Sequence, residues 1–317
     1  YFTFEKVKKW PQFLARFFAL STVIALAIGY YQYFDLVAFS DKKFLSDGRV
    51  IIYAVDGLMS HKNLYASFLL LMLPFVVYGI YSHKGKRRGI MILIGVLHLL
   101  MIFLLKTRAV WVGLAAGGGI AFLILIFNSA QFSISKKWKK RIVFSVIAAF
   151  ILGAGLLTQL EASGQFSTIS RIKSIFNPSH SANVYRIKIW DLTTKVISDN
   201  PVMGVGPGNW KIEAGNYAHE YGFYENQIKW YRPHNDYLWV MAEKGVFGFA
   251  AYLALFIIAI YYLMHVIRKS TDSQNVILAL CLLSGIVAYA VASFFDFPYE
   301  RITHQSFLGI MFAASAR

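Results

Sequence analysis

A histidine and several arginines are placed where they could transfer a group to a hydroxyl acceptor. The stretch 231–248 reads YRPHNDYLWVMAEKGVFG, so Arg232 and His234 directly precede a long apolar run. A neutral imidazole can accept a proton near neutral pH, and a guanidinium can donate two parallel hydrogen bonds to phosphate oxygens. This combination suits a reaction in which His234 activates a hydroxyl while arginines hold a phosphate-bearing leaving group.

The apolar run after His234 contains charges of its own. Glu243 and Lys244 lie two helical turns into the run, and a charge inside a bilayer is costly unless it has a partner. Adjacent residues do not face each other on a helix, so each of the two needs a separate partner. We expect Glu243 to pair with an arginine of the bundle, where it could also help to position His234.

The elements that must position these residues are membrane-spanning helices. Hydrophobic residues make up 57% of the 317 residues and charged residues only 15%, whereas soluble domains contain about 25% charged residues. Apolar runs long enough to cross a bilayer recur along the chain, which predicts an all-α fold, a polytopic membrane helix bundle of about eight helices. The expected spans are residues 12–34, 64–82, 89–105, 109–127, 142–159, 236–264, 275–295 and 303–316.

The net charge of +16 is concentrated in short segments between the apolar runs. This is the pattern of cytoplasmic loops in membrane proteins, and it differs from the single basic face of a nucleic-acid-binding domain. The basic segments are residues 6–9, 84–88, 136–141 and 268–269. The opposite, external side then receives residues 35–63, 106–108, 160–235 and 296–302.

The external segment 160–235 has an internal pattern. Apolar residues at helical spacing over 183–199 predict an amphipathic helix; they are Tyr185, Ile189, Leu192 and Val196. The next stretch, 200–210, contains two prolines and three glycines and predicts a shaped turn. It lacks the Lys-Ser/Thr pair of a phosphate-binding P-loop. We therefore expect one transmembrane domain over 1–317 with a partly helical external loop at 160–235.

The predicted topology gathers cations on the external side. Arg108, Arg186 and Arg301 join Arg232 there, and His61 is a further external histidine. Such arginines can also simply reach lipid phosphates, and a histidine before an apolar run can serve as a polar cap. We expect no metal and no cofactor, because the chain has no HxxxH or HExxH motif and a single cysteine.

Several stretches together resemble the O-antigen ligase and Wzy-type polymerase superfamily of bacterial envelope proteins. In chain order they are GLMSHKNLYASFLLLMLPF (57–75), KTRAVWVGLAAG (106–117), YRIKIWDLTTKVISDNPVMGVGPGNW (185–210) and HNDYLWVMAEKGVFGFAAYL (234–253). The stretch SFFDFPYER (293–301) is similar to the usual ending of these proteins. The likeness extends from about residue 55 to residue 317.

The resemblance implies a metal-independent, inverting membrane glycosyltransferase with a GT-C-like fold. Such enzymes move a glycan from undecaprenyl pyrophosphate to an acceptor hydroxyl, which for an O-antigen ligase belongs to lipid A–core, at the periplasmic face of the inner membrane. By this resemblance Arg108 and Arg186 bind the pyrophosphate, and His234 is the catalytic base or orients the acceptor. The secondary candidates are Arg232, Asn235, Asp236, Glu243 and Arg301. Members of the superfamily have further helices upstream, which we expect to be missing from this sequence.

Two alternatives stay open at this point. A Wzy-type polymerase would extend a glycan instead of transferring it to lipid A–core, and the residues above do not separate the two. A transporter or flippase of lipid-linked glycans would also have many spans and external arginines. That class predicts ionisable residues near the bilayer midplane and internal pseudo-symmetry, and neither stands out in the sequence.

Overall fold

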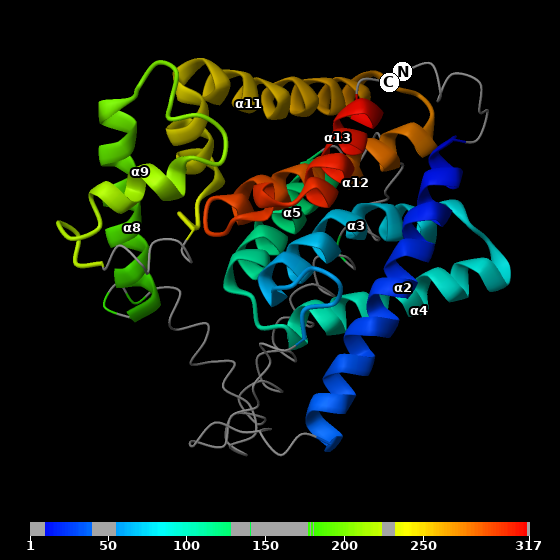
Figure 1. The fold of residues 1–317 in the computed structure, drawn as a ribbon. Coiled ribbons are helices and arrows are strands. Elements are labelled where there is room, and N and C mark those ends of the chain that lie inside the picture. Colours follow the sequence, from blue (N-terminus) through cyan, green and yellow to red (C-terminus); the bar gives the residue numbers. More distant parts are fainter. Residues whose placement is uncertain are drawn as a thin grey trace.

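The computed structural model describes residues 10–39, 55–127, 140, 177, 179, 181–223 and 232–315. Within these ranges the regular elements are helices, and no strand occurs. Six of the described helices are long and apolar enough to cross a membrane, which confirms the predicted polytopic helix bundle (Figure 1). They are α2 (Trp10–Phe39), α3 (Lys62–Ser82), α4 (Gly85–Leu104), α5 (Arg108–Phe127), α11 (Asp236–Lys269) and α12 (Ser273–Ser293).

Six of the eight predicted spans correspond to these helices. The predicted span at 142–159 lies outside the described residues. The last one, 303–316, folds as α13 (Ile302–Ser315) after the short 3-10 helix η2 (Pro298–Glu300). With 14 residues, α13 rises about 21 Å, which is less than the roughly 30 Å of a bilayer core. The described part of α13 is thus shorter than a bilayer-spanning helix, and the last residue of the predicted span, 316, lies outside the described residues.

Two helices form the centre of the bundle. The apolar window of α3 is 78% buried and that of α12 is 72% buried, against 22% for α5 and 17% for α11. Helix α5 approaches α12 closely at two glycines. A Cβ atom added at Gly113 or Gly117 would lie only 2.4 or 2.3 Å from a backbone oxygen of α12, so only glycine fits there. The outer faces of α4 and α11 expose large apolar side chains, as expected of lipid-facing helices.

A second, smaller hydrophobic cluster lies at one end of the bundle, where α8 (Ser181–Asp199) and α9 (Trp210–Asn216) pack beside the start of α11 (Figure 1). The predicted amphipathic helix is confirmed, since Ile189, Leu192 and Val196 of α8 are fully buried. They pack in one cluster with Trp210 and Trp239. The apolar face of α8 is thus covered by α9 and α11.

The turn between α8 and α9 docks onto a break in α11. Gly245 has non-helical backbone (φ 63°, ψ −170°), and a Cβ atom there would lie 2.0 Å from the Val202 carbonyl oxygen. At this break, backbone N–H groups of Val205 and Val246 donate to the carbonyls of Ala242 and Pro201, each at 2.9 Å. The predicted turn is confirmed, and Gly245 is required both by the positive φ and by the close approach.

Glu243 lies at the same joint but has different partners from those predicted. Its Oε1 accepts a hydrogen bond from Trp239 Nε1 at 2.8 Å and one from the Trp210 backbone N–H at 3.4 Å. The prediction of an arginine partner is therefore wrong. Because the carboxylate is buried, these two donors satisfy it and hold the start of α9 against α11. Its neighbour Lys244 lies over the ring of Tyr299, 5.2 Å from the centroid.

Candidate functional site

Three spanning helices, α3, α5 and α11, begin near one another at the end of the bundle that carries α8. Ser60, Lys106 and His234, which shortly precede these helices, have φ values of 61°, 50° and 52°. They are the non-glycine residues with positive φ in the described part of the chain. Such backbone is uncommon for residues with a side chain, and it concentrates at functional sites. The three helix starts are therefore the candidate location of a functional site.

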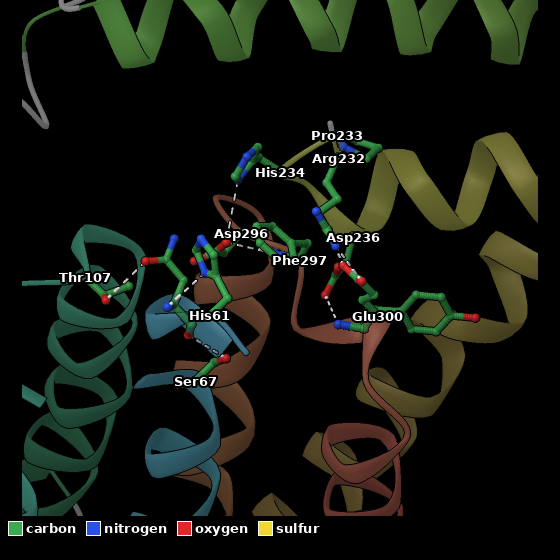
Figure 2. A network of polar contacts seen from close by, with 12 residues as sticks. His61, Ser67, Thr107, Arg232, Pro233, His234, Asp236, Asp296, Phe297 and Glu300 are labelled. Atoms are coloured by element: carbon green, nitrogen blue, oxygen red, sulfur yellow. Dashed lines mark hydrogen bonds and ion pairs between the residues drawn. The ribbon is translucent and has the colours of Figure 1, made fainter. Parts of the chain in front are cut away.

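His234 faces a buried carboxylate (Figure 2). Its Nδ1 lies 3.6 Å from Asp296 Oδ1, and Asp296 is only 2% exposed. Burial alone would raise the pKa of this carboxyl, but the contact with His234 and the charge of Arg186 bring the pKa below its ordinary value. Asp296 is thus ionised at neutral pH. An ionised carboxylate at this distance from Nδ1 favours the tautomer that carries its proton on that nitrogen, in which Nε2 can accept a hydrogen bond.

His61 is a second histidine near His234; the sequence predicted its side of the membrane but not this proximity. Phe297 lies between the two histidines, with ring centroids 4.8 Å from His234 and 5.4 Å from His61. His61 caps α3, since its Nδ1 accepts from the Asn63 N–H at 3.1 Å. Burial lowers the pKa of His61 below the ordinary histidine value, and the charge of Asp296 only partly opposes this effect. His61 is therefore neutral, and its only signal in the sequence was its position just before an apolar run.

Arg108 and Arg186 line one pocket of about 180 Å³. Arg108 is the first residue of α5, and Arg186 lies in α8. Another wall residue, Trp190, donates its Nε1–H to the carbonyl of Pro233 at 2.8 Å. The remaining walls include Asn183, Ile187 and Phe295. Phe295 and the hydrogen bond from Trp190 to Pro233 place the pocket next to the chain segments that carry Asp296 and His234, and the charge of Arg186 acts on Asp296.

The electrostatic character of this end favours an anion. Helix N-termini carry partial positive charge, and the starts of α3 and α5 meet where Thr107 Oγ1 donates to Asn63 Oδ1 at 3.4 Å. Lys62 is buried between them, with its Nζ 3.3 Å from the Leu105 carbonyl oxygen. Lys62, Arg108 and Arg186 thus concentrate positive charge at this end of the bundle, which favours an anionic group there.

Arg232 is held by a carboxylate. Its Nη2 donates to Glu300 Oε1 at 2.9 Å, and its Nε donates to Glu300 Oε2 (Figure 2). The guanidinium also lies 5.2 Å from the centre of the Phe297 ring. This bidentate ion pair fastens the loop before α11 to η2, and Glu300 offsets the charge of Arg232.

The other secondary candidates contact the backbone near the site. Asn235 caps α11 by accepting from the N–H groups of Tyr237 and Leu238 at 3.0 and 3.1 Å. Asp236 is fully buried and accepts from the Tyr299 N–H at 3.0 Å. Arg301 ends η2. Asn235 and Asp236 thus fix the start of α11, and with it the position of His234.

Comparison with known proteins identifies the family. The model of the O-antigen ligase family matches residues 93–253, about half of the chain. A Rickettsia conorii protein named as a polysaccharide ligase is 26% identical over 220 residues, which cover 66% of this chain and 48% of that protein. Proteins of the same name from Rickettsia felis and Rickettsia bellii are 26% and 25% identical over 59% and 62% of this chain, and over 43% and 46% of their own lengths. The chain thus spans less than half the length of these relatives. The family match shows that this chain belongs to the O-antigen ligase family.

Proposed function

We propose that this protein is a membrane glycosyltransferase that moves a glycan from undecaprenyl pyrophosphate to an acceptor hydroxyl. The proposed reaction takes place at the periplasmic face of the bacterial inner membrane, with lipid A–core as the acceptor. The family match and the names of the relatives support glycan ligation in general. The identities of donor and acceptor are part of the proposal.

One arrangement carries the proposal. Two arginines from different helices, Arg108 and Arg186, line a pocket together with Trp190 and Phe295, next to the chain segments that carry His234 and Asp296. A pyrophosphate in that pocket would meet two guanidinium groups, each able to donate two parallel hydrogen bonds. An acceptor hydroxyl entering from the other side of the sugar would meet the imidazole.

In the proposed reaction the acceptor oxygen attacks the anomeric carbon, and the bond from that carbon to the pyrophosphate oxygen breaks. The hydroxyl proton passes to Nε2 of His234, and Asp296 stabilises the imidazolium that forms. Arg108 and Arg186 stabilise the negative charge on the departing undecaprenyl pyrophosphate, which is a role that arginines or metal ions can fill. Attack opposite the leaving group inverts the anomeric configuration.

The test is transfer by the full-length protein in lipid nanodiscs, with EDTA present throughout. The donor is an undecaprenyl-pyrophosphate-linked oligosaccharide, and the acceptor is lipid A–core. We expect His234→Ala, Arg108→Ala and Arg186→Ala each to lower transfer by about 10²–10³-fold, the loss typical of a removed preorganised group. Matched controls are His219→Ala, which lies in the turn after α9, and Arg88→Ala, at the opposite end of the bundle. Both should keep transfer within about twofold of wild type.

The products separate the alternatives. Glycan on lipid A–core supports the ligase proposal, whereas longer glycans on the donor lipid with none on the core would assign a polymerase. Normal transfer by folded His234→Ala protein would remove that residue from the mechanism. Transfer that occurs only in a parallel reaction without EDTA would contradict the metal-independent reaction.

A further inference from the structure

A second polar pocket lies at the opposite end of the bundle from the candidate site. It has a volume of about 970 Å³ and brings together the start of α2, the connection from α3 to α4 and the start of α12. In Figure 1 this connection lies on the right of the view, and α8 and α9 lie on the left. Helix α3, with 21 residues, separates the two ends by about 31 Å. The charged side chains on its walls are Arg16, Lys84, Lys86, Arg87 and Asp272.

The cations of this pocket have no carboxylate partner within the described ranges. Arg16 donates its Nε–H to Nε2 of the buried His83 at 3.2 Å. The other ring nitrogen of His83 lies 3.0 Å from the Gly79 carbonyl oxygen, to which it donates. This contact fixes the direction of Arg16 without supplying a negative charge. The one carboxylate on the wall, Asp272, instead caps α12 by accepting from the Gln274 N–H at 2.9 Å.

The start of α4 also favours an anion. Its first turn contains Lys86 and Arg87 and no acidic residue, although positive charge at a helix N-terminus is unfavourable. The residue before the helix, Lys84, makes no capping hydrogen bond with its side chain. The first N–H groups of α4 and the charges around them would both be satisfied by phosphate oxygens.

An apolar pocket adjoins the polar one. It has a volume of about 310 Å³ and shares Arg16, His83 and Arg87 with the polar pocket, while Ile90 and Met91 of α4 form the rest of its wall. Beyond it, the outer face of α4 exposes Ile90, Leu93 and Val96. A ligand that fills both pockets therefore needs a phosphate group and an apolar chain joined to it.

We propose that this end of the bundle binds the headgroup of an anionic phospholipid. Arg16 and Arg87 hold the phosphate, and an acyl chain passes Ile90 along the outer face of α4. The charge distribution of the loops assigns this side to the cytoplasmic leaflet. The proposal does not depend on the proposed glycan transfer, because none of these residues belongs to the candidate active site.

The test measures binding of dioctanoyl-phosphatidylglycerol to the full-length protein in detergent by native mass spectrometry. We expect Arg16→Gln and Arg87→Gln each to weaken binding by about fivefold. The matched control is Arg88→Gln, because Arg88 is exposed in the same first turn of α4 but does not line the pocket. It should change binding by less than about twofold. Unchanged melting temperatures would show that the variants are folded, and Arg87, which is exposed, carries the test if Arg16→Gln unfolds.

Three results would overturn the proposal. Equal weakening by all three variants would mean that only general attraction between charges operates. Equal affinity for dioctanoyl-phosphatidylcholine would remove the requirement for an anionic headgroup. Inorganic phosphate that binds as tightly as the lipid would assign the pocket to a free anion.

Discussion

The two ends of α3 both gather positive charge, but they hold it in different ways. At the end that begins with Lys62, that lysine and the carboxylate of Asp296 are buried, and Arg108 and Arg186 are half-buried. At the end that closes with His83, the side chains of Arg16 and Arg87 are exposed and the nearby carboxylate, Asp272, is exposed too. Salt screens buried charges much less than exposed charges. Function at the first end should therefore depend on exact geometry, and binding at the second end on charge and ionic strength.

The largest expected difference between the two ends is in their carboxylates. Asp296→Asn keeps the shape of the side chain but presents a neutral amide to His234 Nδ1, so it no longer stabilises the imidazolium. We expect transfer to fall by about 10²–10⁴-fold with little change in KM. Asp272→Asn at the other end preserves the cap of α12, so transfer by this variant should stay within about twofold of wild type. If Asp296→Asn raised KM and left kcat unchanged, the carboxylate would only shape the binding site.

The second expected difference is in the tolerance of glycines. Gly245→Ala places a Cβ atom 2.0 Å from the Val202 carbonyl oxygen at a positive φ, whereas a Cβ atom at Gly89 of α4 meets nothing within 4 Å. We expect Gly245→Ala to lower the free energy of unfolding by about 2–4 kcal/mol. Gly89→Ala should raise it by up to about 1 kcal/mol, because alanine favours the helix. Thermal unfolding in nanodiscs measures both changes, and equal melting temperatures would contradict the close packing at the site end.

A smaller effect is expected from the ion pair of Arg232 and Glu300, whose side chains are 28% and 20% exposed. A double-mutant cycle with Arg232→Met and Glu300→Gln should give a coupling energy of about 1–2 kcal/mol. The same cycle for Arg16→Met and Asp272→Asn at the other end should give a coupling near zero, since no ion pair joins them. Similar coupling energies at both ends would mean that the arginines at the two ends are paired with carboxylates to the same extent.

The smallest effect concerns acid stability. The pKa of Asp296 is below its ordinary value in the folded protein, so its contribution to stability is complete above the unfolded pKa of about 4. This contribution is lost as the pH falls through the lower, folded pKa. The difference in melting temperature between wild type and Asp296→Asn should therefore be largest near neutral pH and shrink below about pH 4. A difference that grows in acid would mean that Asp296 is protonated in the folded protein.

The local parts of the fold could be predicted from the sequence. The face of α8 that carries Ile189 and Leu192 follows from spacing within one helix. The turn before Trp210 follows from its prolines and glycines. Both depend on residues that are close together in the chain, and both are confirmed.

The partners that come from distant segments could not be predicted. Glu243 bonds to the backbone of Trp210, 33 residues earlier, and nothing in either stretch indicates that pairing. His61 meets Phe297 across more than two hundred residues, so its place beside His234 emerges only from packing. The shared pocket of Arg108 and Arg186 likewise requires the docking of α8 beside α5. The sequence indicated the residue types, and the tertiary fold determines which of them meet.

The break at Gly245 divides α11 into two segments that pack in different hydrophobic clusters. The part before the break, with Trp239 and Ala242, packs in the cluster of α8 and α9, while Phe256 and Leu263 beyond it belong to the membrane core. The hydrogen bonds from Val205 to Ala242 and from Val246 to Pro201 close the joint between them. Insertions after α9 would leave this joint unbroken. The turn after α9 can therefore vary in length while the histidine shortly before α11 keeps its position.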